Sequence, residues 1–292
     1  MKGRQGSCEA LARRQLVSEA PRVGFQGALG AFSEEAARAL VPDAEPIPYA
    51  TFEAVVRAVE ALEVQAGAVP VENTLAGVVA EAYEALVAGN VYTIGEVATP
   101  IRHCLLGLPG ATTQRVREAR SHPVALSQCR GFFAEHPQIR AQAVYDTAGA
   151  AEEVAALGDP SLAAIASRRA GDRYGLEVLQ PDLQDRDDNQ TRFYLIVRDP
   201  VVASATGLLK TACVAELENR PGALHELLGV FAGRTLDLTN VASRPGVSPW
   251  TYRFILEFRH ADRDEGAAAI EEAERFCTSV KVLGTFPAWQ PS

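Results

Sequence analysis

Residues 189–197 read Asn-Gln-Thr-Arg-Phe-Tyr-Leu-Ile-Val and follow an acidic loop that contains Pro181. The apolar run at 193–197 is typical of a buried strand, so Thr191 and Arg192 are predicted at the mouth of that strand. A hydroxyl and a fixed cation held by a rigid strand can act on an anionic ligand. These residues alone favour an ordinary solvated strand end, and the choice between the two interpretations depends on the rest of the chain.

The overall composition is that of a soluble globular protein. The chain has 292 residues, of which 47% are hydrophobic and 22% charged, enough for two or three domains. Its formal net charge of −9, with no window rich in Lys and Arg, argues against nucleic acid as a partner. Five scattered cysteines without a C-x-x-C pair indicate free thiols rather than a disulfide or zinc framework.

The N-terminal segment and the lengths of the apolar runs bear on localisation. Residues 1–20 contain basic residues but no continuous apolar stretch, and we expect a loose extension rather than a signal peptide. No segment approaches the roughly 20 apolar residues that a membrane span needs. The sequence therefore predicts a cytoplasmic protein without a membrane partner.

Strands and helices are predicted to alternate through the first half, which indicates an α/β layer with a mostly parallel sheet. The first unit is a strand at 22–26, a glycine turn at 27–30, and a helix for which Ser33 is the expected N-cap. The glycines at positions 24, 27 and 30 depart from the G-x-G-x-x-G fingerprint, which excludes a dinucleotide site. A helix start after a glycine turn still suits a small anion.

Polar residues follow several of the predicted strands. One apolar strand ends in Glu72-Asn73-Thr74, and Gln128 lies near the start of a later helix. Ligands of α/β sheets bind beyond the carboxyl ends of strands. Ser33 and the three residues Glu72-Asn73-Thr74 are expected there. For Glu72, a catalytic role and a structural hydrogen-bonding role carry equal weight.

Three more predicted strands end in a hydroxyl residue, namely Ser121, Thr147 and Ser167. Any one of them is explained as a helix cap, whereas several converging on one cleft are less easily explained that way. Ser121 and the adjacent histidine cannot easily face each other as nucleophile and base, and Cys129 is expected in the core. The acidic run at 185–188 lacks the spacing of a calcium loop and is expected to be solvated, so no metal site is predicted.

The last third of the chain predicts a separate small module after a linker. Residues 208–288 carry the order strand, helix, strand, strand, helix, strand, which is the split βαβ ferredoxin-like plan. A module of this size rarely hosts chemistry by itself, and its sequence shows no acid–base pair. We therefore expect a regulatory or dimerising role for it.

Six motifs occur in the order seen in prephenate dehydratases, and the chain resembles that family over residues 21–288. They are residues 27–33 (GALGAFS), 70–74 (PVENT), 121–123 (SHP), 128–129 (QC), 146–151 (DTAGAA) and 191–193 (TRF). Two further motifs, 220–224 (RPGAL) and 243–245 (SRP), are similar to those of the ACT domain that follows in the family. Six ordered motifs are far more specific than a single signature.

The resemblance implies conversion of prephenate to phenylpyruvate, water and CO₂ in L-phenylalanine biosynthesis, with L-phenylalanine as allosteric effector. It implies an N-terminal extension at 1–20, a catalytic domain at 21–200, a linker at 201–207 and an ACT regulatory domain at 208–288. The catalytic domain is expected to have two α/β lobes like a periplasmic binding protein, and the protein to form a homodimer or homotetramer. Prephenate carries a carboxylate and a hydroxyl on its ring, and expelling both groups makes the ring aromatic. The reaction therefore runs downhill, and no cofactor is expected.

By resemblance and position, Thr191 is the principal catalytic residue, and Glu72 is placed with it. The expected substrate-binding residues are Ser33, Asn73, Thr74, Ser121, Gln128, Thr147 and Arg192. The expected allosteric residues are Asn219, Gly222, Ala223, Leu224, Ser243 and Arg244. Thr191 is a poor formal acid, so it is expected to donate a hydrogen bond to the leaving oxygen. Arg192 either pairs with a substrate carboxylate or holds Glu72 or an aspartate of the preceding loop.

The chain departs from the family pattern at two positions. Ala31 replaces a common threonine, which removes a possible donor there, and Ala242 replaces the glutamate of the regulatory Glu-Ser-Arg-Pro motif. The second change predicts a weaker or differently selective effector site. Two alternative functions are arogenate dehydratase, whose substrate differs only in its side chain, and a non-catalytic two-lobed sensor of small molecules.

Overall fold

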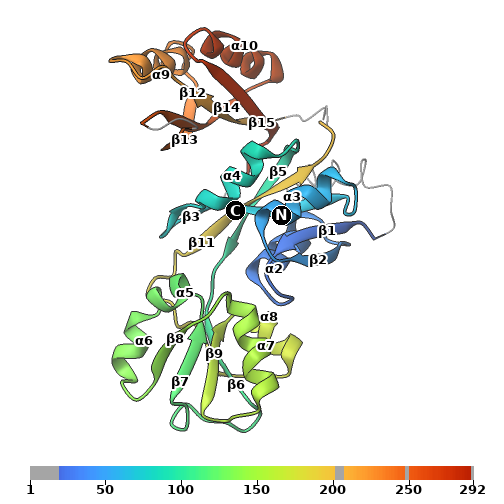
Figure 1. Ribbon diagram of the computed structural model, residues 1–292, viewed down its shortest axis with the longest axis vertical. Coiled ribbons are helices and arrows are strands. Elements are labelled where there is room, and N and C mark those ends of the chain that lie inside the picture. The colour runs from blue at the N-terminus through green and yellow to red at the C-terminus, as the bar shows by residue number, and fades with distance from the viewer. Residues whose placement is uncertain (1–19, 201–206, 247–249, 291–292) are drawn as a thin grey trace.

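Three β-sheets organise the chain, one in each of three parts stacked along the long axis of the molecule (Figure 1). The computed structural model describes residues 20–200, 207–246 and 250–290. The predicted extension at 1–20 and linker at 201–207 lie outside the described residues, apart from Ala20 and Gly207. We name the parts the first lobe (22–100 with 190–197), the second lobe (104–180) and the C-terminal module (209–287).

The first lobe is a sheet with a reversed strand between parallel neighbours. Its strands are β1 (Arg22–Gln26), β2 (Glu45–Tyr49), β3 (Ala66–Asn73), β4 (Gly77–Val78), β5 (Tyr92–Pro100) and β11 (Gln190–Val197). Its helices are α2 (Phe32–Leu40), α3 (Phe52–Glu60) and α4 (Ala80–Ala88). The strand order is β2-β1-β3-β11-β5, with β4 paired to β3. Strand β11 is antiparallel to both β3 and β5 because it returns from the second lobe.

The second lobe is also a mixed sheet, where a mostly parallel one was predicted. Its strands are β6 (Cys104–Gly107), β7 (Glu118–Ser121), β8 (Arg140–Ala143), β9 (Leu162–Ala166) and β10 (Glu177–Gln180). Its helices are α5 (Pro123–Ser127), α6 (Arg130–Glu135), α7 (Thr147–Leu157) and α8 (Arg168–Tyr174). In the order β10-β6-β9-β7-β8, β6 is antiparallel to both neighbours, because it enters directly from the first lobe without a crossover helix.

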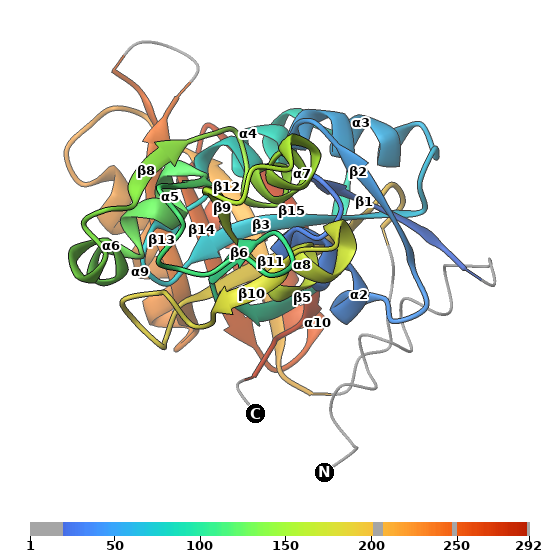
Figure 2. The same ribbon diagram turned by 90° about the horizontal axis from the view of Figure 1, so that it is seen from below.

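The chain crosses between the lobes twice, at residues 101–103 and again at 181–189. The backbone N–H of Ile101 donates to the carbonyl of Asn189 at 2.9 Å, which joins the two crossings. Seen from below, the second lobe lies in front of the first lobe and the C-terminal module (Figure 2). The residues at these crossings therefore have neighbours in both lobes.

The C-terminal module has the predicted order of strand, helix, strand, strand, helix, strand. Its elements are β12 (Leu209–Glu216), α9 (Ala223–Gly233), β13 (Asp237–Pro245), β14 (Tyr252–His260), α10 (Arg263–Glu274) and β15 (Ser279–Pro287). The four strands form an antiparallel sheet in the order β13-β14-β12-β15. Within the described residues of the whole chain, no helix is long and apolar enough to cross a membrane.

Alternation along β11 sends its side chains into two different cores. Phe193 and Leu195 pack with α2 and with residues of the second lobe. Tyr194 and Ile196 pack instead with α3, α4 and the C-terminal sheet. Because successive side chains of a strand point to opposite faces, β11 is covered on both sides, as its continuous apolar run predicted.

Strand β12 of the C-terminal sheet is likewise buried on both faces. In β12, Cys213 and Ala215 pack on the module's own helices, whereas Val214 packs against the first lobe. The module approaches the first lobe closely at Gly284 of β15, where an added Cβ would lie 2.1 Å from the carbonyl oxygen of Thr93 in β5. A side chain cannot fit at that distance, so glycine permits the docking of the module.

Gly284→Ala is therefore expected to push β15 away from β5 and to lower the free energy of unfolding by about 1–3 kcal/mol. Urea unfolding measures the change. Gly229→Ala in α9 is the matched control, since its added Cβ meets nothing within 4 Å and a helical alanine is favoured over glycine. Equal stability of G284A and wild type would contradict the close contact.

The start of α2 corrects one prediction. The helix begins at Phe32 with Ala31 at the N-cap, so the prediction of Ser33 as the N-cap is wrong. The carboxylate of Glu34 accepts a hydrogen bond from the Gly30 N–H at 2.7 Å. This contact satisfies a backbone donor at the helix start without a hydroxyl at the N-cap.

Candidate active site

Thr191 lies on β11 directly opposite Asn73 of β3. The Asn73 Nδ2 donates to the Thr191 Oγ1 at 3.0 Å, which leaves the threonine proton available for donation elsewhere. The same Nδ2 approaches Asn189 Oδ1 at 2.8 Å and the Gln190 carbonyl at 3.0 Å, while Oδ1 accepts from two backbone N–H groups of the following turn. With both N–H groups engaged, Asn73 is placed to hold Thr191 rather than to bind a ligand.

Gln128 of the second lobe joins this cluster through its side-chain oxygen. Its Oε1 lies 3.0 Å from Asn189 Nδ2 and 3.1 Å from His103 Nε2. Among the described residues nothing accepts a hydrogen bond from its Nε2, so these N–H groups are available to a ligand. The structure thus brings Thr191, Asn73 and Gln128 together, as the sequence predicted.

Asn189 and His103 belong to this cluster although the motifs did not predict them. Their exposed fractions are 1% and 2%, and each lies on one of the two crossings between the lobes. Burial lowers the pKa of His103, so its ring is neutral at neutral pH. For Asn189, the available signal was a polar residue directly before a predicted buried strand, and the sequence around His103 contained no comparable signal.

Two of the predicted hydroxyl residues are engaged by the backbone. Ser121 is fully buried and donates from Oγ to the Ile165 carbonyl at 2.5 Å, so the predicted substrate contact does not fit this geometry. Thr74 donates from Oγ1 to the Asp188 carbonyl at 2.9 Å and accepts from the Gln190 N–H at 3.0 Å. Thr74 therefore fixes the end of β3 to the start of β11.

The remaining predicted hydroxyls lie at helix starts. Ser33 is half-buried in the first turn of α2, and Thr147 is half-buried as the first residue of α7, whose N-cap is Asp146. No hydrogen bond in the described part of the chain joins either hydroxyl to Thr191. Ser167 caps α8 as expected and donates to the Gly30 carbonyl of the first lobe at 2.7 Å.

The residues considered for other chemistries have structural positions. Cys129 is fully buried, and burial raises the pKa of its thiol to about 12, which confirms it as a core residue. The Asp185 carboxylate accepts from the first N–H groups of α6, and the acidic run around it is exposed, as predicted. In the described ranges, no three His, Cys, Asp or Glu side chains are arranged to hold a metal ion.

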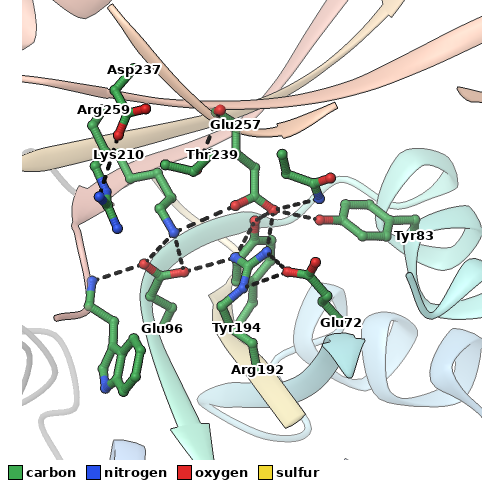
Figure 3. A network of polar contacts seen from close by, with 12 residues as sticks. Glu72, Tyr83, Glu96, Arg192, Tyr194, Lys210, Asp237, Thr239, Glu257 and Arg259 are labelled. Atoms are coloured by element: carbon green, nitrogen blue, oxygen red, sulfur yellow. Dashed lines mark hydrogen bonds and ion pairs between the residues drawn. The ribbon is translucent and has the colours of Figure 1, made fainter. Parts of the chain in front are cut away.

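Arg192 points to the face of β11 that carries the C-terminal module (Figure 3). Its guanidinium lies 2.7 Å from Glu72, 2.9 Å from Glu96 of β5 and 2.8 Å from Glu257 of β14. Of the two predicted roles of Arg192, this geometry fits the scaffolding one, because three carboxylates already engage the cation. The contacts of Glu72 likewise fit its structural alternative, since it pairs with Arg192 on the face opposite Thr191.

Glu257 is the centre of this network and is fully buried. The hydroxyls of Tyr194 and Tyr83 donate to its Oε1 at 2.7 and 2.8 Å, and the Lys210 ammonium lies 3.5 Å away. Burial by itself would raise the pKa of Glu257, but the charges of Arg192 and Lys210 lower it to about 2. A buried ion network therefore connects the strand of Thr191 to the C-terminal module.

The predicted allosteric residues gather at one end of the C-terminal module. Asn219, after β12, donates from Nδ2 to the Trp250 carbonyl at 3.4 Å, next to the turn between β13 and β14. Gly222 adopts φ +87° at the N-cap of α9, which favours glycine. Ala223 is buried and Leu224 is half-buried within α9, while Ser243 and Arg244 lie on β13.

Comparison with known families and sequences finds relatives of this chain. The family "Prephenate dehydratase" matches residues 23–201. A relative from Arabidopsis thaliana, arogenate dehydratase/prephenate dehydratase 2, is 38% identical over 91% of this chain and 72% of its own length. Arogenate dehydratase 2 of Petunia hybrida is 36% identical over the same shares of the two chains.

Solved structures show a likeness over about nine tenths of the chain. Prephenate dehydratase from Arthrobacter aurescens, in complex with L-Phe, has a TM-score of 0.84 at 31% identity over 91% of this chain and 90% of its own. A protein described as a quorum-quenching acylase, GqqA, has a TM-score of 0.83 at 32% identity over 92% and 98%. The family match spans more than half of the chain and agrees with the relatives, so this chain belongs to the prephenate dehydratase family.

Proposed function

We propose that the protein catalyses the decarboxylating dehydration of prephenate to phenylpyruvate, a step of L-phenylalanine biosynthesis. The observation that carries the proposal is the Thr191 hydroxyl, which accepts from Asn73 and keeps its own proton available. In this reaction the bonds from the ring to its hydroxyl and to its carboxylate both break. The electron pair of the carboxylate bond completes the aromatic ring, CO₂ departs, and the hydroxide takes up a proton from the solvent to leave as water.

The role proposed for Thr191 is a hydrogen bond to the departing oxygen as it gains negative charge. One preorganised donor of this kind contributes about 2.7–4 kcal/mol to the transition state. The electrons stay within the substrate, so the proposal requires no redox cofactor. Phenylpyruvate formation from prephenate by the purified protein tests the function, and the absence of product would refute it.

Arogenate is the alternative substrate, because it differs from prephenate only in carrying an amine where prephenate carries a keto group. Similar proteins are named for one or both activities. Assays of both substrates side by side decide between them. A higher kcat/KM for arogenate than for prephenate would replace the proposed substrate while keeping the chemistry.

We further propose that residues 21–200 form the catalytic domain and that residues 208–288 form an ACT regulatory domain controlled by L-phenylalanine. A similar solved structure is described as a complex with L-Phe, and the predicted effector motifs meet at one end of this module. The contact between Arg192 and Glu257 supplies a physical connection to the strand of Thr191. Ala242, in place of the family's glutamate, is the reason to expect a weaker or differently selective site.

Titration of L-phenylalanine into the protein is expected to produce heat in a calorimeter and to change the turnover rate. Arg244→Ala, in the motif, is expected to weaken the binding. Arg259→Ala is the matched control, because Arg259 pairs with Asp237 at the other end of the module. If the wild type showed no heat and no change of rate, the proposed regulation would be refuted.

A homodimer or homotetramer in the cytoplasm completes the proposal. The family resemblance supports the assembly, and β13 lies at the edge of its sheet, where no strand of the described residues pairs with its outer side. Light scattering coupled to gel filtration measures the mass in solution. A strictly monomeric protein at assay concentration would refute the assembly without affecting the proposed reaction.

A non-catalytic sensor remains the alternative from another class, and turnover of either substrate excludes it. An acylase activity, named for one similar structure, has less support in the described residues. The Ser121 hydroxyl is donated to a backbone carbonyl, and burial raises the pKa of Cys129 to about 12. Neither Ser121 nor Cys129 is therefore an activated nucleophile.

A further inference from the structure

We propose that Asn189 and His103 are positioning residues that fix the direction of the Gln128 side-chain amide. Together they hold its oxygen inside the protein and leave its two N–H groups free to bind the substrate beside Thr191. The identity of that substrate rests on the proposed function. The direction of the amide rests on hydrogen bonds alone, and it can be traced from the backbone outward.

The direction begins at Asn73, where the backbone decides which end of the amide is the oxygen. The N–H groups of Leu75 and Ala76 point at one atom of this amide, at 3.0 and 2.9 Å, and only the oxygen can accept from them. The nitrogen must therefore be the atom that faces Thr191 and Asn189. The observed contacts at 3.0 and 2.8 Å agree with this assignment.

Asn189 transmits this direction from the first lobe to the second. Because Asn73 presents N–H groups, the facing atom of the Asn189 amide has to be its oxygen, and its nitrogen has to point the other way. That nitrogen lies 3.0 Å from Gln128, so the atom of Gln128 that meets it has to be Oε1. The Gln128 amide is thereby turned with its nitrogen away from Asn189.

His103 supports the same direction from the other crossing. Its Nε2 lies 3.1 Å from the same Oε1, and a neutral ring can only make this contact by carrying its proton on Nε2. The Nδ1 is buried and has no hydrogen-bond partner among the described residues, which also disfavours a proton there, since an unpaired buried donor is costly. The backbone of His103 forms hydrogen bonds with Gln184 and Leu183, and its ring packs edge-on against Phe32.

Thr191 and Gln128 therefore both present hydrogen-bond donors, and Asn73 fixes the direction of each. Asn73 leaves the Thr191 proton available, and the path through Asn189 leaves the Gln128 N–H groups available. A substrate of this family carries carboxylates, which accept hydrogen bonds and repel an amide oxygen. A reversed Gln128 amide would present its oxygen to the substrate instead of its donors.

Asn189→Asp tests the relay because it keeps the shape and the acceptor toward Asn73 but replaces the donor toward Gln128 by a second acceptor. We expect kcat/KM to fall by about 10²-fold, the loss typical of one catalytic donor. Thermal unfolding is measured alongside, because a carboxylate at a site that is 1% exposed is expected to lower the stability. Gln128→Met should cause a similar loss. In the Gln128→Met background, Asn189→Asp should cost no more than about threefold, because both changes act through one group.

Two results of this cycle would overturn the proposal. One is wild-type kcat/KM in N189D, and the other is a full additional loss when the two changes are combined. If N189D fails to fold, His103 gives a second route. His103→Gln places an amide near the former Nε2 and should retain most of the activity, whereas His103→Leu lacks the donor and should lose about 10-fold or more. Equal losses in the two histidine variants would show that ring packing, not donation, is what matters.

A direct readout of the hydrogen-bond direction does not depend on turnover. The protein has five histidines, and ¹⁵N-histidine correlation spectra of wild type and H103Q identify the signals of His103. The relay predicts a neutral ring with its proton on Nε2, and a switch of that proton in N189D. A proton on Nδ1 in the wild type would overturn the proposal. A wild type that converts neither prephenate nor arogenate, with the Nε2 proton in place, would refute the function and leave the relay standing.

Discussion

Thr191→Val is expected to lower kcat by about 10²–10³-fold while leaving the fold intact. The substitution removes the Thr191 hydroxyl, which the Asn73 amide holds with its proton available, and valine keeps nearly the same shape. The Asn73 amide loses one acceptor but keeps Asn189 Oδ1 and the Gln190 carbonyl, so no donor is stranded. Steady-state kinetics with prephenate, together with thermal unfolding, measure both halves of the expectation.

Two further variants separate the hydroxyl of Thr191 from its bulk. Thr191→Ser keeps a hydroxyl and should retain most of the turnover. Thr93→Val makes the same change on β5 of the same sheet, at a buried hydroxyl without a hydrogen-bond partner among the described residues, and should leave kcat unchanged. Near-normal turnover in T191V would remove Thr191 from the mechanism.

Arg192→Met is expected to lower the free energy of unfolding by about 3–5 kcal/mol, because it leaves buried carboxylates without their shared cation. Among the described residues, Lys210 would then be the one remaining cation at Glu96 and Glu257. Glu257→Gln should cost less, since an amide oxygen still accepts from Arg192 and the tyrosines while one buried negative charge is removed. Urea unfolding of both single variants and of the double variant measures the coupling between the two positions.

The two roles of Arg192 give opposite results in this cycle. If Arg192 is a scaffold residue, Glu257→Gln should restore part of the stability lost in Arg192→Met, because it reduces the excess of negative charge that Arg192→Met leaves. As a substrate ligand it would instead show wild-type stability, a raised KM and no rescue. The second outcome would contradict the contacts seen with the C-terminal module.

The pH dependence of stability offers a separate check on Glu257. Its pKa in the folded protein is about 2, below the ordinary value of 4.5, so its contribution to stability is present above 4.5 and is lost as the pH falls toward 2. The stability difference between wild type and Glu257→Gln should therefore shrink over that range. A constant difference from pH 6 down to the acid limit of folding would contradict the ionised, paired state.

Local sequence was sufficient for the elements and for part of the site. The apolar run after Arg192 predicted a buried strand, and strand periodicity with turn residues predicted the βαββαβ order of the C-terminal module, both of which are observed. By resemblance, Thr191, Asn73 and Gln128 were expected in one site, and the structure connects their side chains by hydrogen bonds through Asn189. These features depend on side chains near in sequence or on the order of motifs along the chain.

Helix starts and long-range pairing were less accessible. Ser33 was predicted as a cap, but the helix already begins at Phe32, and the carboxylate of Glu34 accepts from the Gly30 N–H before the helix. Ser121 was expected to face a ligand, but its partner is a carbonyl 44 residues away in β9. Which acceptor a hydroxyl finds depends on strands that pair only in the folded chain.

The sequence by itself determined that Thr191 and Arg192 are adjacent at a strand mouth and hence on opposite faces. It could not determine what covers each face. Only the tertiary structure placed Asn73 and Asn189 beside the Thr191 hydroxyl, and Glu72, Glu96 and Glu257 around the Arg192 guanidinium. The reason is that the charge on a buried cation has to be balanced by whichever carboxylates folding brings near it, and here one of them comes from another module 65 residues away.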